Sequence, residues 1–305
     1  MNQGLVAELD ELISLKRFAR KVSYQPEGKV LKAGNHLSRR RGRGMDFAEV
    51  RNYQAGDEIR HMEWRVTART GRPHVKVYQE ERERPVVLLA DFNPSMYFGT
   101  RVAFKSVIAA KLATLIAWTA IKQGDRVGAL LYSAEQHNEF IPRSRETAIL
   151  PLLSTLSRYT GQFSQAADST APAVNLSEAL IRLRRVARPG SILVLISDFY
   201  QLDSDTEKHL GRLRLSNDVL AYHICDALEL APPPPAQYAI TDGQREMLLE
   251  TTDNRTCQGY QNWCDQHTMT PDAMFRRLQI QYQRVTADMD LARLVHQTFP
   301  RRKHA

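Results

Sequence analysis

Three oxygen-bearing side chains, Asp91, Asn93 and Ser95, stand at alternate positions in "ADFNPSMYFG", residues 90 to 99. They follow the apolar run "PVVLLA", which is typical of a strand buried on both faces. A second acid, Asp198, ends another apolar run in "SILVLISDF". Carboxylate, amide and hydroxyl oxygens are the ligands that Mg²⁺ and Ca²⁺ prefer, whereas zinc and copper favour nitrogen and sulfur. The spacing therefore predicts a site for a hard divalent cation.

A turn without any ligand is the simpler alternative for the same residues. Asp91 could cap the turn that follows it, and Asp-x-Asn-Pro-Ser has the composition of a stable turn by itself. The residues alone leave both interpretations open.

The elements around this stretch predict an α/β fold. Apolar runs that read as buried strands alternate with helical patterns from residue 85 onwards, which indicates a doubly wound, mainly parallel sheet flanked by helices. The segment "EFIPR" is expected to be an edge strand. In such a sheet the ligand site lies at the carboxyl ends of the strands. Asp91 and Asp198 each end a strand, so both are expected at the same edge.

Composition shifts divide the chain into three predicted segments. Residues 1–84 hold a basic helix, over about residues 5–21, and a polar segment with balanced charge. Residues 85–230 form the α/β core. Residues 231–305 begin at a proline run, which is a stiff spacer, and continue with a hairpin around Asp242-Gly243 and a helix, strand and helix that complete the core.

The positive charge is concentrated near the N-terminus. The net charge is +8, and residues 1–45 contain ten Lys or Arg against four Asp or Glu. The densest run holds Arg39, Arg40, Arg41 and Arg43, which we expect to face a partner. Nucleic acid is the alternative partner, but we do not expect it, because no aromatic residues are interleaved with these arginines.

The bulk composition predicts a globular cytoplasmic protein. The hydrophobic fraction is 43% and the charged fraction 25%. No apolar run reaches the roughly 18 residues of a membrane span, and the N-terminus lacks the pattern of a signal peptide. Cys257, Cys264 and His267 lie close in sequence, but the C-x-x-C pairs of a zinc site are missing.

Two motifs carry a resemblance to known families. "DFNPS" resembles the D-x-S-x-S motif of von Willebrand factor A domains, whose metal-ion-dependent adhesion site binds a divalent cation. "RRRGRGMDFAEVRNYQAGDEIRHMEWRVTARTGRPHVKVYQEERE" is similar to the signature of the domain of unknown function 58 family, which precedes such a domain. The likeness runs from about residue 20 to the C-terminus.

The resemblance implies a set of ligands for Mg²⁺, or for Ca²⁺ or Mn²⁺. Asp91 and Ser95 match the first and third ligand positions, and Asp198 matches the later acidic ligand. Asn93 replaces the middle serine, and its amide oxygen is expected to coordinate. Val174 stands where the resemblance implies a threonine ligand, and valine cannot coordinate.

The resemblance also implies a function. Similar proteins are partners of MoxR-type AAA+ ATPases in the assembly or activation of other proteins. The chain lacks the phosphate-loop pattern G-x-x-x-x-G-K-[ST]. We therefore expect a non-enzymatic adaptor between such an ATPase and a client protein. The alternative is a Mg²⁺-dependent hydrolase with Asp91 as nucleophile, although "DFNPS" supplies no second acid.

The signature residues before the core are expected to be structural. Arg51, Asp57, Arg60 and Arg69 are predicted to form ion pairs that brace this segment. Trp64 is predicted to fill a small core.

Overall fold

The computed structural model describes residues 4–19, 45–80, 84–162, 174–241 and 246–299. The chain divides into two units. The larger comprises Met1–Val22 and Arg84–Phe299, and the smaller comprises Ser23–Glu83 and Pro300–Ala305.

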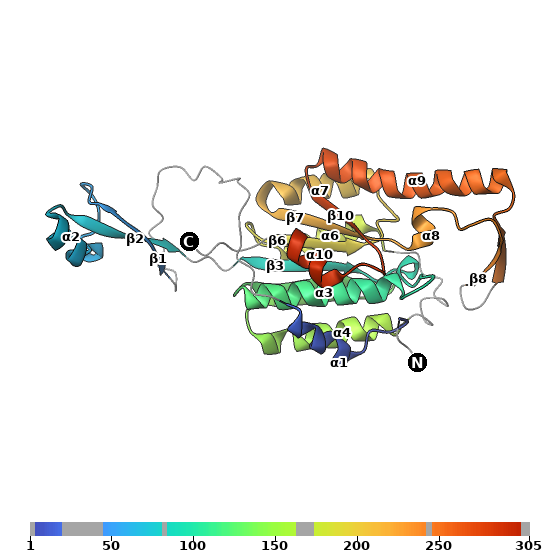
Figure 1. The fold of residues 1–305 in the computed structure, drawn as a ribbon, viewed down its shortest axis with the longest axis horizontal. Helices are drawn as coiled ribbons and strands as arrows, with labels where there is room; N and C mark the ends of the chain where they lie inside the picture. Colours follow the sequence, from blue (N-terminus) through green and yellow to red (C-terminus); the bar gives the residue numbers. More distant parts are fainter. Residues whose placement is uncertain (1–3, 20–44, 81–83, 163–173, 242–245, 300–305) are drawn as a thin grey trace. The chain divides into compact units, whose positions relative to one another are not determined.

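A six-stranded sheet runs through the larger unit (Figure 1). Its strand order is β10 (Gln281–Val285), β7 (Asp218–Ile224), β6 (Ile192–Ser197), β3 (Pro85–Asp91), β4 (Arg126–Tyr132) and β5 (His137–Arg143). Every neighbouring pair is parallel except β4 and β5, which are antiparallel. The fold is therefore α/β with a mainly parallel sheet, and the segment around "EFIPR" is an edge strand, as predicted.

Helices cover both faces of this sheet (Figure 1). One face packs against α1 (Leu9–Ser14), α3 (Lys105–Lys122), α4 (Leu150–Thr160) and α10 (Leu291–Thr298). The other face packs against α6 (Leu176–Val186), α7 (Ser204–Ser216) and the end of α9 (Asn254–Arg277). Because α3 lies between the sheet and α1, α4 and α10, almost all of its side chains are buried. A helix that is apolar on all sides is stable only in such a position.

The sheet reverses its direction of growth at β3. The chain goes from β3 to β4 on one side, and later returns to place β6 on the other side of β3. In an open parallel sheet, this reversal leaves a crevice at the carboxyl ends of the two strands. Asp91 is the last residue of β3, and Asp198 directly follows β6.

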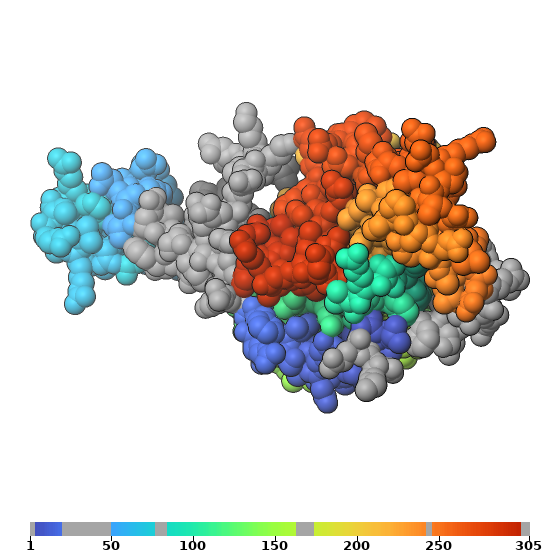
Figure 2. All heavy atoms as spheres, turned by 45° about the vertical axis from the view of Figure 1, so that its right-hand side comes forward, coloured from blue at the N-terminus to red at the C-terminus, as the bar shows by residue number. Residues whose placement is uncertain are grey.

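The segment after β7 completes the larger unit. It contains α8 (Ala227–Leu230), the antiparallel pair of β8 (Gln237–Thr241) and β9 (Glu246–Glu250), then α9, the edge strand β10 and α10. In the space-filling view these segments, in orange and red, cover one side of the larger unit (Figure 2).

The first residues of the chain also belong to the larger unit. We expected residues 1–84 to form one segment, with a helix over residues 5–21. Instead, α1 is short, is followed by a 3-10 turn at Leu15–Arg17, and buries Leu12 against the core. The indole N–H of Trp118 donates to the carbonyl of Leu12 at 3.3 Å. This contact places the start of the chain with the core rather than with the signature segment.

The smaller unit is built on two antiparallel strands, β1 (Met45–Asn52) and β2 (His74–Glu80). A 3-10 turn, Ile59–His61, and the helix α2 (Trp64–Thr70) connect them. Arg51 donates to both carboxylate oxygens of Asp57, at 2.8 and 2.7 Å. This bidentate pair braces the loop after β1, as the sequence predicts.

One expectation for the smaller unit is wrong. Trp64 is 64% exposed, so it does not fill a core there. The reason is size, because among the described side chains of this unit only Val75 is buried. Arg60 and Arg69 are exposed, and their predicted ion pairs with Asp46 or with the acids of residues 80–83 involve side chains outside the described ones, so those pairs stay a prediction.

Candidate functional site

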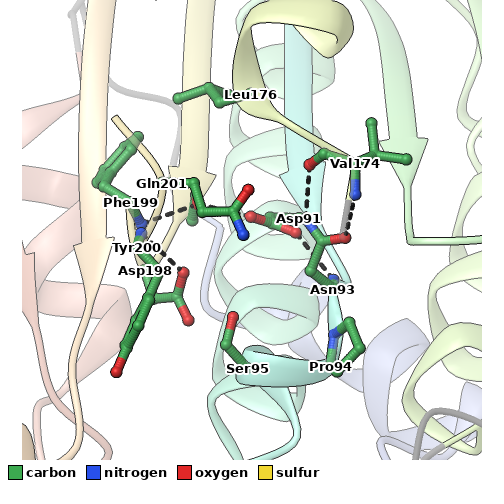
Figure 3. A pocket seen from close by; sticks show the side chains of 11 residues that line it. Asp91, Asn93, Pro94, Ser95, Val174, Leu176, Asp198, Phe199, Tyr200 and Gln201 are labelled. Atoms are coloured by element: carbon green, nitrogen blue, oxygen red, sulfur yellow. Dashed lines mark hydrogen bonds between the residues drawn. The ribbon is translucent and has the colours of Figure 1, made fainter. Parts of the chain in front are cut away.

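A small pocket lies at the carboxyl ends of β3 and β6, where the sheet reverses (Figure 3). Its volume is about 100 Å³. It is lined by Asp91, Asn93, Pro94, Ser95, Val174, Leu176, Ser197, Asp198, Phe199, Tyr200 and Gln201. The structure thus brings together the four residues that the sequence predicts as ligands. It also adds Ser197 and Gln201, which the sequence analysis missed although they flank Asp198.

Asp91 is a buried carboxylate held in place by two hydrogen bonds. The backbone N–H of Asn93 donates to its Oδ1 at 2.8 Å, and the hydroxyl of Ser197 donates to its Oδ2 at 2.7 Å. Burial, followed by the negative charge of the nearby Asp198, raises the pKa of Asp91 to about 7. These effects outweigh the hydrogen bonds that Asp91 accepts, so the folded protein disfavours its ionised form.

Asp198 differs from Asp91 because a cation contacts it directly. The ammonium of Lys105 lies 2.9 Å from its Oδ2, and both side chains are buried. Burial works to raise the pKa of Asp198, but Lys105 outweighs it, and the pKa falls below its usual range. The Ser95 hydroxyl adds to this effect, and it points towards Asp198 in Figure 3.

The backbone is strained directly after Asp198. Phe199 has φ of 50°, in the left-handed region that a bulky residue rarely adopts. The Phe199 N–H donates to Ser197 Oγ at 3.0 Å, and its ring packs edge-on against Phe275. Such strain costs roughly 1–3 kcal/mol and is concentrated at functional sites. Here it turns the chain so that Asp198 and Tyr200 both line the pocket.

Asn93 does not point its amide oxygen freely into the pocket. Its Oδ1 accepts from the backbone N–H of Val174 at 3.1 Å, and its Nδ2 donates to the Val174 carbonyl at 3.1 Å (Figure 3). The sequence-based expectation treated this oxygen as a ligand. The structure assigns its hydrogen bonding to the loop before α6, so Asn93 anchors that loop.

Lys105 is the main feature that the sequence analysis missed. It is the first residue of α3, and its ammonium also lies 2.5 Å from Oε1 of Glu229 in α8. Burial alone would lower the pKa of Lys105, but the two carboxylates outweigh it and raise that pKa. No local pattern signals this contact, because the two partners lie 93 and 124 residues further along the chain.

The charge of this buried cluster fits a divalent cation. Asp91, Asp198 and Glu229 supply three negative charges when ionised, and Lys105 supplies one positive charge, which leaves two in excess. The pocket has room for a cation with several waters, since a water needs roughly 10–15 Å³ of such space. The ligands would be Asp91, Ser95 and Asp198. Among the described residues no three His, Cys, Asp or Glu side chains form a metal cluster, so the remaining ligands would be waters or a partner's oxygen.

The predicted partner-binding arginines, Arg39, Arg40, Arg41 and Arg43, lie outside the described residues.

Solved structures of similar fold share little sequence with this chain. The conserved hypothetical protein BatB from Bacteroides thetaiotaomicron is 14% identical with a TM-score of 0.44, over 70% of this chain and 96% of that one. An aerotolerance-related membrane protein from Bacteroides fragilis is 14% identical with a TM-score of 0.43, over 70% and 98%. A von Willebrand factor type A protein from Catenulispora acidiphila is 11% identical with a TM-score of 0.31, over 51% and 36%.

One of these proteins is named a membrane protein, and the expectation of a cytoplasmic location is withdrawn. In the described part of this chain, no helix combines the length and the apolar character that a bilayer span requires.

Sequence relatives identify the family. Uncharacterized proteins of Mycobacterium bovis and Mycobacterium tuberculosis are each 30% identical to this chain over 220 residues, which is 71% of this chain and 66% of theirs. The chain thus spans just under two thirds of the length of these relatives. A family model described as "Protein of unknown function DUF58" matches residues 49–270. The chain therefore belongs to the DUF58 family, the family that its signature residues resemble.

Proposed function

We propose that this chain is a non-enzymatic adaptor that binds another protein through a divalent cation held at the pocket between β3 and β6. The observation that supports this proposal best is the pair of buried carboxylates, Asp91 and Asp198, at one edge of the sheet, where Lys105 contacts Asp198 but is shared with Glu229. Buried negative charge without a partner is costly, and a bound cation would remove that cost.

The protein supplies only part of the coordination shell of the proposed cation. Asp91, Ser95 and Asp198 supply three ligand groups, whereas Mg²⁺ takes six oxygens and Ca²⁺ six to eight. A carboxylate from another protein could replace one of the waters that complete the shell. The cation would then link the two proteins, and its removal would separate them.

The partner that the family resemblance implies is a MoxR-type AAA+ ATPase, with a client protein still to be identified. The chain has no phosphate-loop motif, so the energy of ATP hydrolysis would come from that partner.

One structural observation favours the hydrolase alternative, and another argues against it. A lysine, Lys105, does contact one of the two aspartates, Asp198, as Mg²⁺-dependent phosphoryl transfer often requires. However, Lys105 is bound by two carboxylates and does not line the pocket. The adaptor is therefore the function that we propose.

Thermal unfolding with and without cation tests the site. The wild-type melting temperature is expected to rise with millimolar Mg²⁺, Mn²⁺ or Ca²⁺ relative to EDTA, because a ligand that binds only the folded state stabilises it. Asp91→Ala should abolish the rise. Asp205→Ala, which removes an exposed carboxylate on α7, is the matched control and should retain it. Absence of any rise in the wild type would exclude the cation site.

A binding assay tests the adaptor role. Immobilised full-length chain should retain a purified MoxR-type ATPase from the same organism in Mg²⁺ and release it in EDTA, and Asp91→Ala should not retain it. Phosphatase activity that is lost in Asp91→Ala would instead favour the hydrolase.

A further inference from the structure

The ammonium of Lys105 contacts Asp198, one of the proposed cation ligands, although Lys105 itself does not line the pocket. The ammonium lies 2.9 Å from Oδ2 of Asp198 and 2.5 Å from Oε1 of Glu229. The Lys105 and Asp198 side chains are each 2% exposed and that of Glu229 is 6% exposed, so water screens these charges little. The Asp198 carboxylate would therefore contact both the Lys105 ammonium and a metal ion that enters the pocket.

Lys105 and Glu229 are both held in place by hydrogen bonds. The backbone N–H of Lys105 donates to the Phe98 carbonyl at 2.9 Å. Glu229 closes a capping box in α8, where its Oε2 accepts from the N–H of Asp226 at 2.8 Å. Asp226 in turn accepts from the N–H and the hydroxyl of Thr100, at 3.0 and 2.7 Å. These bonds tie α8 to the loop before α3 and fix Glu229 opposite Lys105.

We propose that Lys105 and Glu229 tune the affinity of the pocket for divalent cations, with opposite signs. Lys105 competes with the cation for the Asp198 carboxylate, and Glu229 draws the ammonium away from Asp198. This inference rests on the proposed function, since it concerns the regulation of the same site.

The opposite signs follow from the charges. A metal ion at Asp198 would lie close to the Lys105 ammonium, and two cations at one buried carboxylate repel each other strongly. One oxygen of Asp198 contacts Lys105, and the other accepts from the Tyr200 N–H at 3.3 Å. A metal ion that binds Asp198 therefore shares its oxygens with these two donors. Removing Lys105 frees the carboxylate. Without the charge of Glu229, the ammonium interacts more strongly with Asp198. Lys105 then competes more strongly with the metal ion for the Asp198 carboxylate.

Titration with Mn²⁺, followed by electron paramagnetic resonance of the free ion or by calorimetry, tests this directly. We expect Glu229→Gln to weaken Mn²⁺ binding about tenfold and Lys105→Met to strengthen it about tenfold. Each change corresponds to about 1.4 kcal/mol. Lys105→Met leaves two buried carboxylates without their ammonium and could prevent folding. Glu229→Gln keeps the shape of the side chain, so it tests the inference even if Lys105→Met does not fold.

The double variant shows whether Glu229 acts through Lys105. If it does, Glu229→Gln has no further effect once Lys105 is Met, and the double variant binds Mn²⁺ as tightly as Lys105→Met. A tenfold weakening by Glu229→Gln in both backgrounds would show a direct effect of its charge and would overturn the inference. Wild-type binding that Glu229→Gln leaves unchanged or strengthens would also overturn it. Lack of Mn²⁺ binding by the wild type and by every variant would instead refute the proposed function.

Discussion

The side-chain amide of Asn93 pairs with the backbone of Val174 through two hydrogen bonds of 3.1 Å each. These are the two positions at which the chain departs from the ligand pattern of von Willebrand factor A domains. The departures are therefore physically linked, because an amide at position 93 holds the loop that carries position 174. Val174, two residues before α6, is held by contacts within the protein, without a cation.

Asn93 and Ser95 should consequently have separable roles. Asn93→Ala leaves the N–H and the carbonyl of Val174 without their partners, and we expect a loss of about 1–3 kcal/mol in the free energy of unfolding. Ser95→Ala should change that free energy much less in EDTA, but should remove most of the stabilisation by Mg²⁺. Urea unfolding of both variants, with and without cation, measures the two effects. Equal stability losses in EDTA would contradict this division.

Replacing Asp91 should stabilise the protein in the absence of cation. Its pKa is raised from 3.8 to about 7, so the folded state retains a proton that the unfolded state has already lost above pH 4. The stability that this group contributes therefore falls as the pH rises from about 4 to 7. Asp91→Asn avoids that loss, which for the full pKa difference amounts to at most about 4 kcal/mol above pH 7.

Urea unfolding in EDTA at pH 5 and pH 8 checks this sign. The advantage of Asp91→Asn over the wild type should be larger at pH 8, and the variant should not respond to Mg²⁺. The Asp205→Asn variant, at an exposed position, serves as the control. A wild type that is more stable than Asp91→Asn at pH 8 in EDTA would show that the buried Asp91 carboxylate does not destabilise the folded state.

Cation binding itself should depend on pH through the same carboxyl group. A metal ligand must be deprotonated, so the cation has to displace the proton of Asp91. We expect Mn²⁺ affinity to be nearly constant above about pH 7.5 and to fall by up to about tenfold for each pH unit below 7. Calorimetric titrations at pH 6, 7 and 8 in buffers of different ionisation enthalpy would detect the released proton. Affinity that is unchanged between pH 6 and 8 would show that the cation displaces no proton from Asp91 in this range.

Trp64 should matter little for the stability of the smaller unit. It is 64% exposed, and surface substitutions usually change stability by less than about 0.5 kcal/mol. Val75→Ala removes a side chain that is 3% exposed and should cost more, about 1 kcal/mol or above. Hydrogen exchange of the amides in β1 and β2 would compare the two variants. Faster exchange in Trp64→Ala than in Val75→Ala would contradict the exposed placement of the indole.

The sequence by itself determined where the strands lie and which carboxylates end them. The buried strands β3 and β6 are encoded by consecutive apolar residues, and parallel strands present their carboxyl ends at one edge. The placement of Asp91 and Asp198 in one pocket follows from these local patterns. The sequence also indicated that Arg51 and Asp57 form ion pairs, but the structure decided that they pair with each other.

Only the tertiary structure decided how these carboxylates are neutralised and which oxygens remain free. Lys105 meets Asp198 and Glu229 because the start of α3, the end of β6 and α8 converge, and Asn93 meets Val174 because β3 lies near the loop before α6. No periodicity in the sequence encodes such contacts, since each joins residues separated by 81 positions or more. Their energies depend on burial and on the distance between charges, which exist only once the layers have packed.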